Sequence, residues 1–230
     1  MRGIVKEREL VLENITPVEK LTVKKLTYLV IKRIVDFLGG LCGVVLLIPI
    51  TLVVILFRIK NKEEGPIFYT QDRIGKNGKV FKLYKFRTMV VGADNMLKEY
   101  LDSHPEENLE YKKFKKLKND PRVTKTGDFL RRTSLDEWPQ FINILIGNMS
   151  LVGPRPYLLR EKEDMGDYYD MIIKAKPALT GPWQIAGRSN VTFNDRMEID
   201  KKYISNLGLK NDLSIVFKTV EKVFKSDGAI

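Results

Sequence analysis

Cysteine and histidine are almost absent from this sequence of 230 residues, which contains one of each, Cys42 and His104. A single cysteine cannot form a disulfide within the chain, so a small disulfide-stapled fold is excluded. One histidine in a polar stretch disfavours a histidine-based catalytic triad and a histidine-rich metal site. The sequence also lacks a Gly-rich phosphate loop of the Walker type and a dinucleotide-binding fingerprint. These two common ways of holding a nucleotide are therefore not indicated.

Basic side chains outnumber acidic ones, 40 Lys and Arg against 29 Asp and Glu, so the formal net charge is +11 at pH 7. A strongly basic protein is expected to meet an anionic partner, which is a nucleic acid, a membrane surface or a phosphorylated substrate. Residues 1–62 carry 11 basic and 5 acidic side chains, a net charge of +6. The excess is thus concentrated in the first quarter of the chain, beside its least polar segment.

The least polar segment contains 21 residues without a charge, from Phe37 to Phe57. As a helix it would be roughly 30 Å long, which matches the hydrocarbon thickness of a bilayer. Lys and Arg flank it on both sides, at positions 20, 24, 25, 32 and 33 before it and 58, 60 and 62 after it. Because Lys and Arg favour the cytoplasmic side of a membrane, the two flanks predict a segment that enters and leaves by the same leaflet.

Pro49 offers the bend that such a re-entrant segment needs, because proline removes a helix hydrogen bond and clashes with the preceding turn. Three glycines permit close packing of this segment against a neighbour, at positions 39, 40 and 43. A single spanning helix with a kink at Pro49 is the alternative that the residues leave open.

Residues 63–230 are predicted to form one soluble domain of mixed α/β class, mostly helical with a small sheet. This domain follows an N-terminal lead-in and membrane segment at residues 1–62. Strands are expected at 67–69 and 80–86, separated by a turn at 75–78. Helices are expected at 92–118, 135–145, 157–176, 195–206 and 212–224, and a Gly- and Pro-rich loop at 177–190.

Two adjacent carboxylates, Asp136 and Glu137, follow Arg131 at the start of an expected helix. One interpretation is structural, with Ser134 and Glu137 forming a capping box. In the other, the helix begins at Asp136, which keeps Pro139 in the first turn, where proline is tolerated. The positive end of the helix dipole then favours the ionised carboxylate and attracts phosphate oxygens. In that arrangement Asp136 is a candidate phosphoryl nucleophile, and Glu137 is a candidate metal ligand or proton acceptor.

Basic residues in two other segments are candidate phosphate ligands. Arg155 is bracketed by Pro154 and Pro156, which reduce backbone freedom and so pre-organise its planar guanidinium. Lys85 and Arg87 occur in a basic segment with an alternating apolar face. A stiff surface turn and a solvated strand edge are the structural alternatives for these two segments.

Five segments, in their order along the chain, closely resemble the bacterial sugar transferases, also called monotopic phosphoglycosyl transferases. They are the apolar segment with Pro49 and residues 85–89, 120–124, 130–140 and 147–156. The resemblance covers roughly residues 28–225, and the Ser-Leu-Asp-Glu and Ser-Leu-Val-Gly-Pro-Arg-Pro blocks are its most specific parts. It implies a re-entrant helix broken at Pro49 in the bacterial inner membrane, with the catalytic domain facing the cytoplasm. The family often has Ser before that proline, where this sequence departs from the pattern with Ile48.

The resemblance implies transfer of a sugar-1-phosphate from a UDP-sugar to undecaprenyl phosphate with release of UMP. This reaction is the first membrane step of exopolysaccharide, capsule or O-antigen synthesis. The resemblance further implies that Asp136 forms a covalent phospho-sugar intermediate and that Glu137 binds Mg²⁺. The implied phosphate-binding residues are Lys85, Arg87, Arg131 and Arg155.

Residues 178–184 and 186–188 look like the branch of the family that handles simple hexoses, which implies UDP-glucose or UDP-galactose as the donor. Many members of that branch carry several N-terminal spanning helices, so this chain is expected to be the minimal catalytic unit. The expected partners are the UDP-sugar, undecaprenyl phosphate and inner-membrane lipid, with no nucleic acid. The residues do not determine an oligomeric state.

Two other function classes fit the residues less well. A membrane-tethered nucleic-acid-binding or regulatory protein would concentrate basic and aromatic residues in its soluble part, whereas residues 63–230 have a net charge of only +5. An aspartyl-phosphate phosphatase usually has a second carboxylate two residues after its nucleophile, and Trp138 occupies that place.

Overall fold

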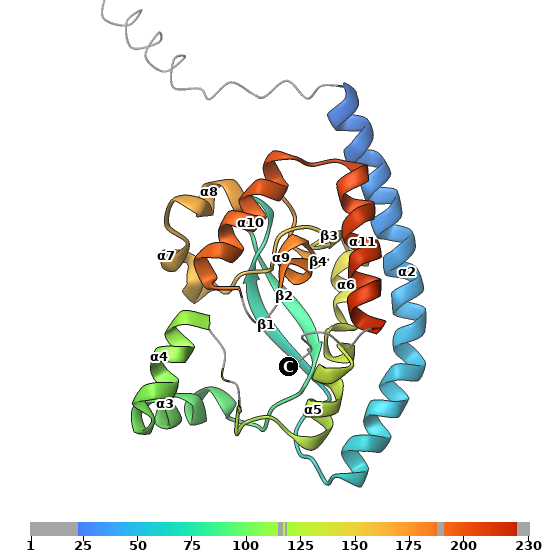
Figure 1. The fold of residues 1–230 in the computed structure, drawn as a ribbon. Coiled ribbons are helices and arrows are strands. Elements are labelled where there is room, and N and C mark those ends of the chain that lie inside the picture. Colours follow the sequence, from blue (N-terminus) through green and yellow to red (C-terminus); the bar gives the residue numbers. More distant parts are fainter. Residues whose placement is uncertain (1–22, 115–116, 118, 188–190, 225–230) are drawn as a thin grey trace, which may run out of the picture.

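The computed structural model describes residues 23–114, 117, 119–187 and 191–224 (Figure 1). Within these residues helices outweigh strands and the sheets are small, which confirms the predicted mostly helical α/β class. The predicted lead-in at residues 1–20, and Arg188 in the predicted loop, lie outside the described residues.

The longest element is helix α2, Val23–Lys60, which contains the whole apolar segment and runs along one side of the molecule (Figure 1). By length and composition it can cross a membrane. Arg58 and Lys60 lie in its last turn, where cations interact favourably with the helix dipole. The helical conformation continues through Pro49. The break at Pro49 and the re-entrant path concern this helix inside a membrane, and they stay predictions.

Helix α2 contacts the rest of the protein from its first turns to its last. Its hydrogen-bonded pairs include, in chain order, Tyr28 with Asp212, Asp36 with Ser150, Gly43 with Trp138, and Arg58 with Glu64. The buried residues of the helix recur along this stripe, while large apolar side chains elsewhere on the helix are exposed. One face of α2 therefore packs against the rest of the protein along nearly the whole length of the helix.

The close approach of α2 to helix α6, Gln140–Leu145, depends on glycine. A Cβ atom at Gly40 would lie 3.0 Å from the backbone nitrogen of Leu145, and one at Gly43 would overlap the ring of Phe141. The close packing predicted from the glycines is thus confirmed.

Strands β1, Phe68–Ile74, and β2, Val80–Phe86, form an antiparallel hairpin in which Phe68 is opposite Phe86. The first strand is longer than the predicted 67–69. Asn77 and Gly78 in the connecting turn have positive φ angles of 57° and 74°, which the residue types Asn and Gly adopt most readily.

A second sheet pairs β3, Ser150–Val152, with β4, Ala178–Thr180, in parallel. The sequence did not predict it, because three residues are too few to display an alternating pattern. The pairing holds the Gly-Pro-Arg-Pro segment after β3 beside the loop after β4, where Gly153 N–H donates to Thr180 O at 2.9 Å.

Most of the predicted helices are present with shifted bounds. In addition to α2 and α6, the described helices are α3 Ala93–Ser103, α4 Pro105–Phe114, α5 Lys125–Arg132, α7 Lys162–Met165, α8 Tyr169–Ile172, α9 Pro182–Ala186, α10 Phe193–Ser205 and α11 Leu209–Phe224.

Two of the predicted helices are interrupted in the structure, so each was wrongly predicted as one continuous helix. The predicted helix 92–118 is two helices, and the second begins at Pro105, because proline is accommodated only in the first turn. The predicted helix 157–176 is instead α7 and α8 with short 3₁₀ turns around them. Gly166, with a φ of 47° and ψ of −131°, ends α7 and breaks the run.

Helix α11 buries an apolar residue and a charged one on its inward face, Ile215 and Asp212. The side chain of Asp212 is buried, where it accepts hydrogen bonds from Tyr28 and Tyr203 and pairs with Lys32 at 2.7 Å. A separate stripe of this helix is apolar and exposed, at Leu209, Leu213, Val216, Phe217 and Val220. The start of α11 is tied to α2 by the hydrogen bonds that Tyr28 and Lys32 donate to Asp212, and Figure 1 shows the two helices running next to each other.

Candidate active site

A large cavity lies between the β1–β2 hairpin, the Pro-Arg-Pro segment and helices α3 and α5, and its volume is about 920 Å³. This volume falls in the range of ligand-binding pockets. Asp136 lines it together with all four predicted phosphate ligands, Lys85, Arg87, Arg131 and Arg155. The structure thus brings together five residues that are spread over 70 positions of the sequence.

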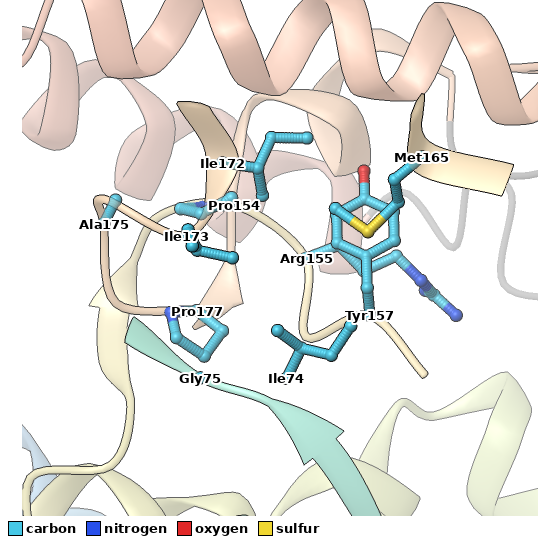
Figure 2. Close-up of a pocket in the computed structure, with 10 residues that line it drawn as sticks. All are labelled: Ile74, Gly75, Pro154, Arg155, Tyr157, Met165, Ile172, Ile173, Ala175 and Pro177. Atoms are coloured by element: carbon cyan, nitrogen blue, oxygen red, sulfur yellow. The ribbon is translucent and has the colours of Figure 1, made fainter. Parts of the chain in front are cut away.

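A second cavity lies on the other side of Arg155, among Ile74, Tyr157, Met165 and Ile172. Its volume is about 10 Å³, which is room for one water molecule at most. Figure 2 shows the guanidinium of Arg155 directed away from Ile173, Ala175 and Pro177. The small cavity is a packing defect behind the Pro-Arg-Pro segment, and the large one is the candidate site.

The carboxylate pair lies on a 3₁₀ turn, Leu135–Glu137, which corrects both sequence interpretations of this segment. Ser134 makes no side-chain capping bond and has a φ of 56°, so the capping box is absent. Helix α6 begins only at Gln140 with Pro139 as its N-cap, so the helix start predicted at Asp136 is also wrong. Proline has no N–H to continue an α-helical ladder, and the Trp138 N–H donates instead to Leu135 O at 3.1 Å.

Lys85, not a helix terminus, supplies the positive charge next to the carboxylates. Its Nζ lies 2.8 Å from Glu137 Oε1 and 3.6 Å from Asp136 Oδ2. The side chain of Asp136 is 13% exposed and that of Glu137 is 36% exposed. Lys85 on β2 therefore contacts both acids and links Glu137 to Asp136, which lines the cavity with it.

The two carboxyl groups differ in their preference for the charged form. Burial raises the pKa of Asp136, the nearby carboxylate of Glu137 adds to this, and Lys85 and Arg131 offset only part of the rise. Burial also acts to raise the pKa of Glu137, but Lys85, Arg155 and Arg73 outweigh it and hold that pKa below its usual value. Glu137 is thus the more firmly ionised of the two.

The predicted basic residues surround the acids from different elements. Arg131, in the last turn of α5, donates from Nε to Thr88 Oγ1 at 3.1 Å. Arg87 is at the edge of the cavity, since its Nε donates to Pro66 O at 2.9 Å and its guanidinium lies 5.5 Å from the Tyr69 ring centre.

Sequence reasoning missed the contribution of β1. Tyr69, Gln71 and Arg73 alternate along this strand and all line the cavity. Arg73 donates to Pro156 O at 2.8 Å and to Gln71 Oε1 at 2.6 Å, so it fixes the Pro-Arg-Pro segment. The period of two in these residues was a usable signal, because alternate residues of a strand share one face.

A pair of adjacent carboxyl groups beside a cavity lined by several guanidinium groups suits a substrate that carries more than one phosphate. The cations neutralise phosphate oxygens, and a carboxylate among them can attack phosphorus. Pro49 is remote from this chemistry in the sequence and lies within α2.

Comparisons with known proteins agree with this chemistry. The family model described as "Bacterial sugar transferase" matches residues 27–226. The chain is 44% identical over 199 residues to a UDP-galactose-lipid carrier transferase of Erwinia amylovora, covering 86% of this chain and 41% of that protein. It is 42% identical over 198 residues to the exopolysaccharide production protein ExoY of Sinorhizobium fredii, covering 86% and 87%.

A third relative is the UDP-glucose:undecaprenyl-phosphate glucose-1-phosphate transferase of Escherichia coli, 39% identical over 194 residues. The match covers 81% of this chain and 39% of that protein. The chain thus spans about two fifths of the length of several relatives and most of the length of ExoY. Because the family model covers nearly the whole chain, the protein belongs to the bacterial sugar transferase family.

Proposed function

We propose that this protein transfers hexose-1-phosphate from a UDP-hexose to undecaprenyl phosphate, releases UMP and so initiates exopolysaccharide synthesis. The observation that carries the proposal is the Asp136–Glu137–Lys85 cluster at the wall of an arginine-lined cavity. The names of the relatives support the substrate classes, with galactose and glucose as the sugars. UDP-glucose and UDP-galactose are therefore the first donors to test.

In the proposed first step an Oδ atom of Asp136 attacks the phosphorus that bears the hexose. The bond between this phosphorus and the oxygen bridging to the second phosphate breaks, and UMP leaves with the bonding electrons. The product is an acyl phosphate, in which the Asp136 carboxyl group is joined through oxygen to the phosphorus of hexose-1-phosphate. In the second step an oxygen of the lipid phosphate attacks the same phosphorus and frees the carboxylate. Two steps suit two bulky anionic substrates, because both need not occupy the cavity at once.

The carboxylate of Glu137 is suited to bind a Mg²⁺ ion whose other ligands come from the substrate. No group of three or more His, Cys, Asp or Glu side chains within the described part of the chain is arranged to hold a metal ion alone. Mg²⁺ is commonly held by one or two carboxylates plus substrate phosphates, and Glu137 with the phosphates would make such a set. When bound, the ion would supply charge neutralisation at the reacting phosphates.

The contacts of α2 support a monotopic arrangement, in which both ends of this helix stay on the cytoplasmic face of the inner membrane. Tyr28 near its start bonds to Asp212, and the ring of Phe57 near its end stacks on that of Phe129 with ring centres 4.9 Å apart, so both ends contact the same soluble domain. A helix that crossed the bilayer would carry part of that polar domain into the hydrocarbon, where unpaired polar groups are costly. The exposed apolar stripes of α2 and α11 would instead face the lipid together.

Accessibility of the two ends of α2 tests this topology. We expect single cysteines replacing Lys24 and Lys62, in a Cys42→Ser background, to be protected from a membrane-impermeant thiol reagent in intact cells. Both should react after permeabilisation, which is the control for side-chain exposure. Reaction of either cysteine from the periplasm of intact cells would refute the monotopic arrangement.

A covalent adduct tests the two-step reaction. We expect protein incubated with UDP-glucose or UDP-galactose, without lipid acceptor, to gain the mass of one phospho-hexose at Asp136, measured by mass spectrometry of the peptides. Addition of undecaprenyl phosphate should then remove the adduct, and UDP alone should leave the mass unchanged. Release of UMP that requires the acceptor and leaves no adduct would contradict the covalent step while retaining the transferase activity.

A further inference from the structure

Helix α10 holds the Pro-Arg-Pro segment from behind, through a face that carries Asp200 and Arg196 one turn apart. Asp200 Oδ2 accepts hydrogen bonds from the backbone N–H of Arg155 at 3.1 Å and from Tyr157 OH at 2.9 Å. Asp200 is fully buried, so this contact fixes where the side chain of Arg155 begins. The same helix face delivers Arg196 to the neighbourhood of Arg155.

Trp183, in the short helix α9, is the meeting point of the two arginines. The guanidinium carbon of Arg155 lies 5.0 Å from the Trp183 ring centre, and that of Arg196 lies 4.7 Å from it. Each contact is a favourable cation–π interaction. Two like charges are nevertheless brought to one ring, and Arg196 is only 5% exposed.

The groups gathered here are mostly hydrogen-bond donors without acceptors. Within the described residues, four buried nitrogens here have no hydrogen-bond partner, namely Arg73 Nε, Arg155 Nε, Arg196 Nε and Trp183 Nε1. Two buried acceptors are also unpaired, Asp200 Oδ1 on α10 and Gln184 Oε1 on α9. Arg73 and Arg196 are both more than nine-tenths buried. Burial, with Arg155 nearby, lowers the pKa of each to about 10, so both remain charged at neutral pH.

Buried unpaired donors are costly, so a site that collects several of them is completed by an acceptor-rich ligand. An anion with several oxygens, such as a phosphate monoester, satisfies guanidinium forks and an indole N–H together. Arg155 also lines the cavity that holds Asp136. Arg155 therefore connects the reacting carboxylates on one side with Arg196 and Trp183 on the other.

We propose that Arg196 and Trp183, together with Arg155, bind the phosphate of the leaving nucleotide. The inference rests on the proposed function, in which the phosphate next to the attacked phosphorus becomes UMP. When the bridging P–O bond breaks, its electron pair stays on that phosphate, and the two guanidinium groups neutralise the added negative charge. In this arrangement Arg196 binds the phosphate of the leaving group, while Lys85 remains paired with Asp136 and Glu137.

Replacement of Arg196 by glutamine tests this inference through UMP binding. We expect UMP to bind Arg196→Gln about tenfold or more weakly than the wild type, while uridine, which lacks the phosphate, binds both equally. Equal affinity for uridine shows that the variant keeps its fold and its nucleoside contacts. A purely structural role for Arg196 would weaken the binding of uridine as well as that of UMP.

The matched control is Lys202→Gln on the same helix, because the side chain of Lys202 is 72% exposed. It should bind UMP as the wild type does. Arg196→Lys keeps the charge but lacks the planar fork, so its affinity for UMP should be intermediate, and this variant replaces Arg196→Gln if the latter does not fold.

The outcomes separate this inference from the proposed function. Wild-type turnover of UDP-hexose, combined with unchanged UMP affinity in both Arg196 variants, overturns the inference alone. A raised KM for a soluble polyprenyl phosphate with unchanged UMP affinity also overturns it, since the site would then belong to the acceptor. A wild type that neither binds UMP nor consumes any UDP-hexose overturns the inference and the proposed function together.

Discussion

Asp136→Asn is expected to reduce the release of UMP from UDP-hexose by at least about a thousandfold, the scale of loss when a nucleophile is removed. Asparagine has the same shape as aspartate, so the 3₁₀ turn Leu135–Glu137 and the contact of Lys85 with Glu137 at 2.8 Å should persist. The amide lacks the anionic oxygen that attacks phosphorus. Initial rates of UMP release, measured with each UDP-hexose, give the loss.

The matched control for Asp136→Asn is Asp128→Asn, four residues before Arg132 on α5. Asp128 pairs with Arg132 at the surface, and its side chain is 56% exposed. Exposed ion pairs of this kind contribute little to stability, so the control should retain wild-type turnover. Near-normal turnover in Asp136→Asn, with the fold intact, would remove Asp136 from the role of nucleophile.

Gly43→Leu is expected to have the second-largest effect, although Gly43 lies in α2 outside the cavity. Any Cβ at this position overlaps the ring of Phe141, so the leucine must push α2 away from α6. Overpacking of this kind typically costs about 1–3 kcal/mol. The Trp138 indole N–H, which donates to Gly43 O at 2.9 Å, would lose its partner.

The displacement should also reach the chemistry, because Trp138 directly follows the carboxylate pair in the chain. A shift of about 1 Å in a reacting group can reduce a rate by about a hundredfold. We therefore expect both a lower thermal unfolding temperature in detergent and a large loss of kcat/KM. Val45→Leu, at a position that is 59% exposed on the same helix, is the control and should change neither quantity. Wild-type activity in Gly43→Leu would show that α2 and the site are not mechanically linked.

The sequence predicted the site residues better than it predicted their local structure. Lys85, Arg87, Arg131 and Arg155 were all identified, and all line the cavity of Asp136. The conformation of the turn that carries Asp136 was not predicted, because it is a 3₁₀ turn and both interpretations assumed an α-helix. Pro139 was the available signal, because a proline this close to a proposed helix start is equally compatible with a delayed start.

Residues that act through other residues left weaker signals in the sequence. Arg196 occurs in an ordinary amphipathic helix, and only its burial beside Arg155 and Trp183 distinguishes it. A helix was predicted at 212–224, but the sequence did not indicate which face of α11 is buried. The structure shows that the face with Asp212 points inward, because Tyr28, Lys32 and Tyr203 satisfy its carboxylate.

By itself the sequence determined the apolar segment of α2, the adjacent carboxylates and the proline-bracketed arginine, since each is a property of neighbouring residues. Only the tertiary structure decided which charges meet. Lys85 and Glu137 are 52 positions apart, and Asp200 reaches Arg155 across 45 positions. Contacts over such separations depend on how the β1–β2 hairpin, the Leu135–Glu137 turn, the Pro-Arg-Pro segment and α10 pack against one another. Local patterns carry no record of that packing, because burial and partner choice are set by elements distant in the chain.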